Sequence, residues 1–278
     1  PRPGHSLDVQ LISTIIAKGE HTYEVHNVKK DGTPFWCEAT TSIFEHPDYG
    51  RVLVAVQQDI SNRKEVQEKL KSSLAEKELL LKEIYHRVKN NLQVIYSLLN
   101  LQSRSLVDST AQSVLRDSQS RIRAMALVHE QLYQSKDLAK IELADYAKSL
   151  AHSLLDTYRA TNPNVSIQLD IEPQQLNIET ALPCGLILTE LISNALKYAF
   201  PEGRSGKITV ISAASPEEQV MLMIQDDGIG LPSDFNLKTA SSLGLRLVRN
   251  LAKQVKGEIL ILPEIAGTKF QLSFPMQA

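Results

Sequence analysis

The stretch LKEIYHRVKNNL, residues 81–92, decides how this chain folds, because it lies in a long run without glycine or proline and carries a helical repeat. Around it, apolar residues recur at spacings of three, four and seven, the pattern of a helix that pairs with another helix: Leu70, Leu74, Leu81, Ile84, Val88, Ile95 and Leu98. We call this stripe the seam. It predicts that two copies of the chain pair as a homodimer.

His86 lies on the face of this helix opposite the seam. It is two residues from both Ile84 and Val88, so at about 100° per residue its side chain points roughly 200° away from them. Glu83 and Asn90 share this polar face. An exposed neutral imidazole is a usable nucleophile near neutral pH. The sequence therefore marks His86 as a candidate acceptor of a covalent group.

The composition limits the class of protein. With 278 residues the chain is long enough for two or three domains. A formal net charge of −2 argues against nucleic acid or an anionic membrane as the main partner, and no apolar run approaches the roughly 18 residues of a membrane span. Cys37 and Cys184 are too few for a disulfide framework or a zinc site, which favours the cytoplasm. Because it starts at Pro1, we expect the chain to be part of a longer protein.

Residues 1–60 read as a helix over about 7–17 followed by an antiparallel meander with strands at about 23–29, 35–44 and 52–58. The pieces KDGTPFW (30–36) and VQQDIS (56–61) resemble the end of a PAS sensor domain, and the first resembles its flavin-binding LOV branch. The first half of such a domain is not in this sequence. Trp36 is interpreted as a packing residue, whereas Gln57 is equally compatible with flavin contact and with a plain polar strand position.

Residues 61–136 predict a long helix from Ser61 to about Gln102, a break near 103–109 and a second helix over about 110–134. The second helix has an apolar stripe of its own: Leu115, Ile122, Met125 and Leu132. Two such helices from each of two chains would form a four-helix bundle. We interpret His129 as a partly buried histidine with a hydrogen-bond partner, and Arg121 and Arg123 as solvated.

Residues 137–278 alternate between helical and strand patterns. The expected helices span about 141–159, 182–199 and 242–255, and the expected strands 166–171, 207–213, 219–225, 257–261 and 268–274. Helices stacked on one face of a mixed sheet predict an α/β sandwich.

Four polar or glycine-rich motifs occur in order in this last region. Glu190, Asn194 and Lys197 recur at the spacing of one helix face. DDGIG (226–230) follows a strand, where glycines let backbone approach a ligand and a carboxylate can accept from an exocyclic amine. SSLGLRLV (241–248) opens a helix whose free N–H groups suit a phosphate, and AGTKF (266–270) enters the last strand.

Two resemblances follow from these motifs. EIYHRVKNNLQVI (83–95) with the following SLLNLQ (97–102) resembles the phosphoacceptor box of sensor histidine kinases, in the subgroup whose box reads His-Arg-Val-Lys-Asn-Asn. The four later motifs resemble the N, G1, G2 and final Gly-Thr boxes of the GHKL ATPase superfamily in its histidine-kinase form. An isolated exposed histidine is usually an ordinary surface residue, and the ATP-site motifs reverse that reading.

The resemblance implies a role for each matching residue. Asn194 would ligate a Mg²⁺ ion that bridges the phosphates of ATP, Asp226 would bind the adenine amino group, and Lys197 would lie near phosphate. Gly228 and Gly230 would give room to the nucleotide, Gly244 would end the lid, and Thr268 would sit near the base.

The chain also departs from the family pattern. Many histidine kinases place an acid directly after the phosphorylated histidine, whereas this chain has Arg87. Among Glu83, Asn90 and Glu190 we rank Glu190 first as the group that controls the proton of His86. No separate phenylalanine box is evident between the glycine motifs.

Together these features predict an α+β multidomain chain. It would comprise a partial PAS-like sheet (1–60), a coiled coil with dimerisation and phosphotransfer helices (61–136) and a Bergerat-type α/β-sandwich ATP domain (137–278). The predicted function is a dimeric, cytoplasmic sensor histidine kinase that transfers phosphoryl from ATP to His86 and then to an aspartate of a response-regulator receiver domain.

Two alternatives stay open: a GHKL ATPase that uses Glu190 as a water base for conformational work, and a non-enzymatic dimeric adaptor. The stimulus, the response regulator and the choice between transfer within and between protomers are left open by the sequence.

Overall fold

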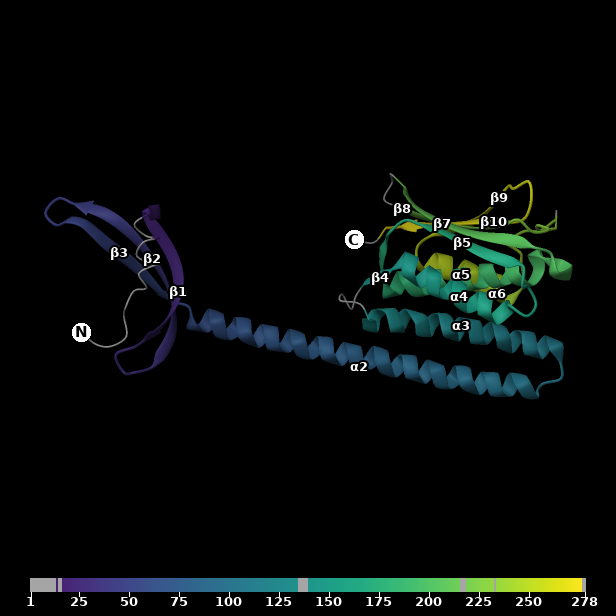
Figure 1. Cartoon of the computed structure of the whole chain (residues 1–278), viewed down its shortest axis with the longest axis horizontal. Coiled ribbons are helices and arrows are strands. Elements are labelled where there is room, and N and C mark those ends of the chain that lie inside the picture. Colours follow the sequence, from purple (N-terminus) through teal and green to yellow (C-terminus); the bar gives the residue numbers. More distant parts are fainter. Residues whose placement is uncertain (1–13, 15–16, 135–139, 216–218, 233, 277–278) are drawn as a thin grey trace. The chain divides into compact units, whose positions relative to one another are not determined.

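The computed structural model describes residues 14, 17–134, 140–215, 219–232 and 234–276, in two compact units, Pro1–Glu78 and Leu79–Ala278 (Figure 1). The expected helix over about 7–17 lies outside the described residues except for Thr14 and Ala17. None of the described helices is long and apolar enough to cross a bilayer.

The first unit contains the predicted three-stranded meander. Strands β1 (Glu20–Val28), β2 (Pro34–His46) and β3 (Gly50–Asp59) pair antiparallel in that order. Alternate residues of β2 are buried, which are Cys37, Ala39 and Thr41. Trp36 packs beside His26, with ring centroids 4.9 Å apart, and under the ammonium of Lys64, 5.2 Å from its ring centroid. These contacts are those of a packing residue.

Helix α2 (Ser61–Ser105) starts directly from this sheet and runs without interruption. Its first residue is fixed twice: the Trp36 N–H donates to Ser61 Oγ, and the Ser61 N–H donates to Asp59 Oδ1, each at 2.9 Å. No residue of α2 is buried, and six seam residues are 41–69% exposed, namely Leu70, Leu74, Leu81, Ile84, Ile95 and Leu98. The predicted stripe is thus present and open in the single chain.

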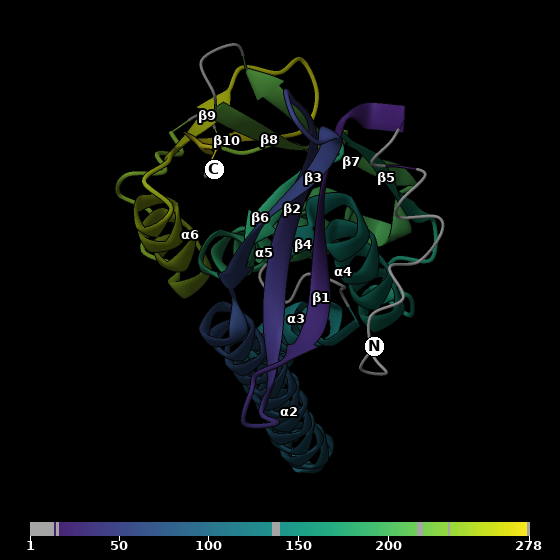
Figure 2. The same ribbon diagram turned by 90° about the vertical axis from the view of Figure 1, so that its left-hand side faces the viewer.

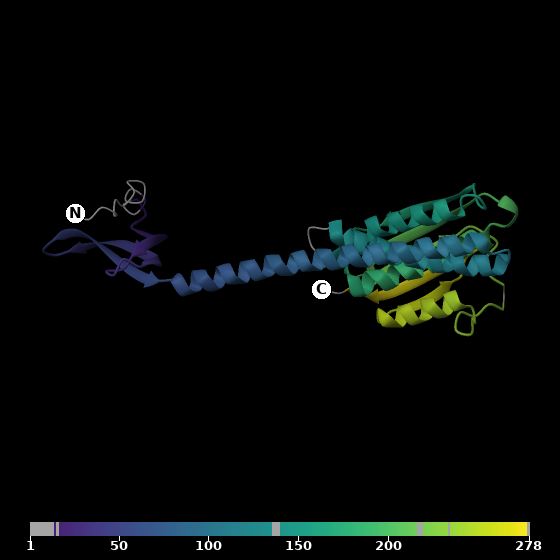
Figure 3. The same ribbon diagram turned by 90° about the horizontal axis from the view of Figure 1, so that it is seen from below.

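In the second unit, helix α3 (Ser109–Gln134) lies alongside the later part of α2 (Figure 3). Lys89 Nζ donates to Glu130 Oε1 at 2.7 Å, and the rings of His86 and Tyr133 lie 5.7 Å apart. The Thr110 N–H donates to Asp108 Oδ1 at 2.8 Å as α3 begins. The predicted helical hairpin, with its break near residues 103–109, is therefore confirmed.

The C-terminal sandwich has the predicted architecture. Strands β5 (Val165–Ile171), β7 (Gly206–Ser215), β8 (Gln219–Asp226), β10 (Lys269–Pro275) and β9 (Glu258–Leu262) form one sheet in the order β5-β7-β8-β10-β9. Only the β5–β7 pair of this sheet is parallel. Helices α4 (Leu143–Tyr158), α5 (Ile178–Asn194) and α6 (Leu243–Gln254) cover one face (Figures 1 and 2).

Three local details differ from the prediction. A two-stranded ribbon of β4 (Lys140–Glu142) and β6 (Gln175–Asn177) was not expected. Helix α5 begins earlier than predicted because Asn177 caps it, accepting the Thr180 N–H at 2.9 Å. Its end is a π-helical turn, Ala195–Ala199, followed by a 3₁₀ turn, Pro201–Gly203.

Helix α3 also belongs to the core of the sandwich. Its buried residues Ala124, Leu127, Val128 and Leu132 join one cluster with the interiors of α4, α5 and the sheet. The fully buried Tyr146 of α4 donates its hydroxyl to the Ala124 carbonyl at 3.1 Å. The layer order in this unit is therefore sheet, then α4, α5 and α6, then α3.

Candidate functional site

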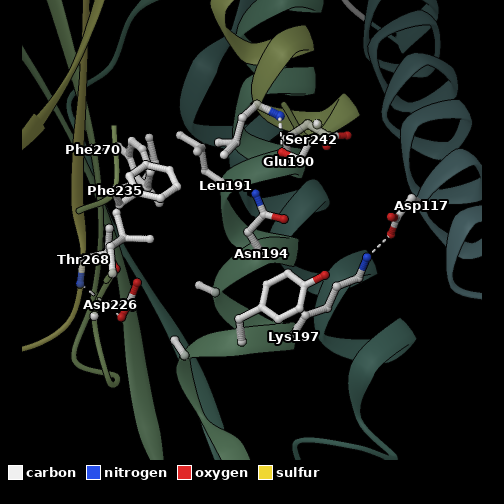
Figure 4. A pocket seen from close by; sticks show the side chains of 18 of the residues that line it. Asp117, Glu190, Leu191, Asn194, Lys197, Asp226, Phe235, Ser242, Thr268 and Phe270 are labelled. Atoms are coloured by element: carbon white, nitrogen blue, oxygen red, sulfur yellow. Dashed lines mark hydrogen bonds and ion pairs between the residues drawn. The ribbon is translucent and has the colours of Figure 1, made fainter. Parts of the chain in front are cut away.

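A cavity of about 490 Å³ opens where α5, the segment after β8, the start of α6, β10 and α3 meet (Figure 4). Its volume lies within the range of about 300–1,000 Å³ that is typical of small-molecule sites. Of the predicted site residues it is lined by Glu190, Asn194, Lys197, Asp226, Gly230, Gly244 and Thr268. Four separate sequence motifs therefore meet at one place.

The α5 face carries its three polar residues into this cavity, as the helical spacing predicts. Asn194 points into the space between the other labelled side chains (Figure 4), and its side chain donates to and accepts from no other described residue. Glu190 is only 5% exposed, and Lys197 follows in the π turn. An amide, a carboxylate and an ammonium thus border one volume.

Two of these charges are already paired with α3. Arg121 Nε donates to Glu190 Oε1 at 2.5 Å and Nη2 to Oε2 at 3.0 Å, while the Lys197 ammonium donates to the Asp117 carboxylate. The expectation that Arg121 is solvated is wrong: its side chain is 16% exposed. A buried carboxylate needs a counter-charge, and Arg121 supplies it. The same contact raises the pKa of Arg121 above its usual value.

Asp226 stands at the opposite wall, at the end of β8, and is 6% exposed. Its Oδ1 accepts the N–H groups of Gly228 at 3.0 Å and Thr268 at 3.2 Å. Burial raises the pKa of Asp226, and these hydrogen bonds oppose that shift. Oδ1 is thus held by the backbone, the Thr268 side chain adds to the stabilisation of the ionised form, and the carboxylate lines the cavity.

The glycines of the motifs have distinct positions. Gly230 has a positive φ of 76° and lines the cavity. A Cβ on Gly228 would lie 2.4 Å from the Ala199 side chain, so this glycine packs against the end of the π turn, outside the cavity wall. A Cβ on Gly244 would lie 2.4 Å from Glu190 Oε2. The start of α6 therefore closes directly over the Glu190 carboxylate.

Aromatic and apolar side chains complete the wall near Asp226. Phe235 and Phe270 face the cavity close to Thr268 (Figure 4), and Ile224 and Leu231 also line the cavity. The sequence interpretation missed Phe235, although it is an aromatic residue between the two glycine motifs. It also missed Asp117 and interpreted Arg121 as solvated, because neither charge gives a local signal outside the apolar stripe of its helix.

His86 does not belong to this cavity. It is exposed on α2, its ring contacts that of Tyr133, and its Nδ1 lies 3.4 Å from Asn90 Nδ2. Arg87, which replaces the usual acid, binds Glu83 at 2.7 Å. The prediction that the imidazole is offered to solvent is confirmed.

His129 differs in part from expectation. It is partly buried beside Tyr85, with ring centroids 5.8 Å apart, but its Nδ1 has no hydrogen-bond partner among the described residues. The predicted partner is therefore absent there. Burial lowers the pKa of His129 below its usual 6.5.

Comparison with protein families matches both halves of this unit. Residues 83–158, which include His86, match the family described as histidine kinase. Residues 180–278, which include all the predicted nucleotide-site residues, match the family described as histidine kinase-, DNA gyrase B-, and HSP90-like ATPase.

Individual relatives agree with these matches. The sensor histidine kinase PdtaS of Mycobacterium tuberculosis is 33% identical over 180 residues, covering 64% of this chain and 35% of that protein. The blue-light-activated histidine kinase 2 of Erythrobacter litoralis is 29% identical over 280 residues, covering 96% of this chain and 77% of that protein. The chain therefore spans about a third of PdtaS and most of the second relative.

Solved structures show the same fold. The histidine kinase domain of the Erythrobacter litoralis EL346 blue-light-activated kinase superposes with a TM-score of 0.53 at 26% identity, covering 73% of this chain and 96% of that one. The longer EL346 structure gives a TM-score of 0.52 at 23% identity, covering 99% of this chain and 84% of that one.

Proposed function

We propose that this chain, which carries the two domains of a histidine kinase, is a dimeric sensor kinase that phosphorylates its own His86 with ATP. The phosphoryl group then passes to an aspartate of a response-regulator receiver domain. The observation that carries this proposal is the presence, within one unit, of an exposed helical histidine and a cavity fitted to a nucleotide.

The cavity suits an adenine nucleotide at both ends. Near Asp226, apolar side chains such as Phe235 and Phe270 offer faces to a base, and the carboxylate can accept from its exocyclic amine. Near the π turn, Lys197 offers an ammonium to phosphate oxygens. An apolar end with one acceptor and a cationic end match a base and a polyphosphate.

A magnesium ion fits the donor set at Asn194. The amide oxygen of Asn194 faces the cavity, and the described residues contain no cluster of three or more histidine, cysteine, aspartate or glutamate side chains that could enclose a metal. Mg²⁺ is usually held by one or two protein oxygens together with substrate phosphates and water. When bound, it neutralises charge that develops on the phosphates.

The transfer step needs only positioning and proton control from the protein. A ring nitrogen of His86 forms a bond to the γ-phosphorus, the bond from that phosphorus to the bridging oxygen breaks, and ADP leaves. The imidazole N–H proton passes to a base. We retain Glu190 as the first candidate for that base, with Glu83 next.

We extend the proposal to the dimer interface, the sensor and the cellular compartment. The exposed seam is the dimer interface, since a second α2 would cover its apolar side chains. The meander and its motifs are the C-terminal part of a PAS-like, LOV-related sensor, and the box of α2 belongs to the His-Arg-Val-Lys-Asn-Asn subgroup. Two free, buried cysteines, Cys37 and Cys184, fit a reducing compartment such as the cytoplasm.

Labelling with [γ-³²P]ATP tests the function. The chain should acquire a label that is acid-labile and base-stable, and His86→Gln should abolish it while leaving nucleotide affinity unchanged. His129→Gln is the matched control, because it removes the other histidine of the same helical hairpin and should keep the label. A fully labelled His86→Gln variant would exclude this acceptor. Phosphate release without labelled protein would favour the ATPase alternative. Absence of nucleotide binding would favour the non-enzymatic adaptor.

A further inference from the structure

Helix α3 places two opposite charges, one turn apart, against two opposite charges of the nucleotide site. Arg121 binds Glu190 through two hydrogen bonds, and Asp117 accepts from Lys197. Glu190 and Lys197 flank Asn194 on α5 and in the turn that follows it. Figure 4 shows the Asp117–Lys197 contact at one side of the cavity, with Asn194 between it and Asp226.

Both pairs are shielded from water. The side chains of Arg121 and Glu190 are 16% and 7% exposed, and those of Lys197 and Asp117 are 13% and 29% exposed. Ion pairs that are largely buried are screened much less by salt than surface pairs, and losing one partner leaves a buried charge. These contacts therefore favour one position of α3 on the ATP-binding domain strongly over its neighbours.

In that position the cavity is far from the phosphoacceptor. His86 contacts Tyr133, and Arg121 precedes Tyr133 by 12 residues on α3, which at 1.5 Å per residue is about 18 Å along the helix. The register of the hairpin agrees, since Lys89 pairs with Glu130. In a parallel dimer that pairs along the seam, the His86 of the second chain would lie at the same position along the helix axis as the first. Neither histidine is then within reach of a phosphate held at Asn194.

We propose that Asp117 and Arg121 form an autoinhibitory latch that holds the ATP-binding domain where it cannot phosphorylate His86. This inference rests on the proposed function, because it concerns control of the same site. The latch occupies the residues that catalysis needs: Arg121 neutralises Glu190, and Asp117 engages Lys197 and sets a carboxylate facing the phosphate end of the cavity.

Apart from the hydrogen bond from the Tyr146 hydroxyl to the Ala124 carbonyl, the remaining contacts of α3 with the sandwich are mainly apolar and less directional than the ion pairs. Ala124, Leu127, Val128 and Leu132 pack into the sandwich core, and apolar burial is non-directional. The ion pairs, in contrast, have fixed donors and acceptors. Breaking them allows α3 and the ATP-binding domain to shift against each other, which is the movement that transfer to His86 requires.

A different role for Asp117 and Arg121 predicts the opposite change in ATP affinity when the two residues are replaced. If Asp117 and Arg121 instead complete the nucleotide site, their removal weakens ATP binding. If they form a latch, their removal strengthens it, because Lys197 no longer has to leave Asp117 and no carboxylate faces the phosphates.

The test compares the full chain with Asp117→Asn/Arg121→Gln, with Asp117→Asn alone, and with the control Arg116→Gln. Arg116 neighbours Asp117 but lies outside the cavity and makes no ion pair among the described residues. Two quantities are measured: the affinity for Mg·ATP from displacement of a fluorescent ATP analogue, and the initial rate of His86 labelling. Circular dichroism verifies that each variant is folded.

The latch predicts that the double variant binds ATP about tenfold more tightly and labels His86 faster. The factor of about ten corresponds to the free energy of one hydrogen bond between charged groups, which the parent chain has to break before ATP binds. Asp117→Asn alone should shift both quantities in the same direction by less, and Arg116→Gln should shift neither. Unchanged or weaker ATP binding, or an unchanged labelling rate, overturns the latch. If neither the parent chain nor the double variant labels His86 although both bind ATP, the proposed function fails, and the affinity of the double variant still decides whether α3 obstructs the site.

Discussion

Replacing Asp226 with Asn should change which base the cavity accepts while leaving the fold intact. Asp226 Oδ1 accepts the N–H groups of Gly228 and Thr268, and an Asn oxygen can accept both. The second position changes from an acceptor to an NH₂ donor, which then faces the adenine amine, donor against donor. Losing a hydrogen bond to a charged group costs about 1.5–3 kcal/mol, so the Kd for ATP should rise about 10- to 150-fold.

The same variant should gain affinity for inosine triphosphate, which has a carbonyl oxygen where ATP has the amine. Titration calorimetry with both nucleotides measures the two affinities in parent and variant, which makes the four values a thermodynamic cycle. An unchanged Kd for ATP, or a loss for both nucleotides without the exchange of preference, would show that Asp226 does not read the base.

The pH dependence of this site follows from the raised pKa of Asp226. Binding the amine requires the ionised carboxylate, so ATP affinity should fall as the pH drops through a range above the usual 3.8 of an aspartate. Because a carboxyl with a raised folded-state pKa loses stabilisation as the pH rises through that value, the Asn variant should be at least as stable as the parent at neutral pH. A large drop in its melting temperature would contradict this.

Three further predictions concern the base that accepts the His86 proton, the linker in α2 and the partly buried His129. In an Arg121→Gln background, adding Glu190→Gln should slow His86 labelling about 100-fold if Glu190 is the base, and equal rates would move the test to Glu83→Gln. Insertions between Ser61 and Leu74, upstream of the point where Lys77 interrupts the seam, should change labelling periodically, since each residue rotates the later part of α2 by about 100° and about seven restore the phase. A flat series would mean that the linker is a passive tether. Because the pKa of His129 is lowered in the folded chain, the unfolded chain binds the proton first as the pH drops. The free energy of unfolding should therefore fall below about pH 6.5 and level off below the folded-state pKa. His129→Gln should flatten this dependence in denaturant titrations, and an identical slope in both proteins would refute it.

Local sequence patterns were sufficient for the elements and for most of the site. The seam repeat fixed α2, and alternating residues with turn glycines fixed the meander, because both periodicities follow from backbone geometry over a few residues. Glu190, Asn194 and Lys197 share a helix face for the same reason. The resemblance of the ordered motifs to the GHKL boxes predicted that Asp226, Gly230 and Thr268 would lie together, and the three residues line one cavity.

What the sequence could not supply are the pairings between distant positions. Arg121 and Glu190 are 69 residues apart and Asp117 and Lys197 80 apart, and nothing near α3 indicates that its charges are neutralised by α5. The short β4–β6 ribbon and the place of Phe235 in the wall have the same origin, since each depends on a partner brought close only by folding. The sequence alone thus predicted His86 as the acceptor, and it indicated the nucleotide motifs together with their helices and strands. Tertiary packing alone decided that α3 covers the ATP-binding domain and pairs with Glu190 and Lys197, because a charge that becomes buried needs an opposite charge beside it.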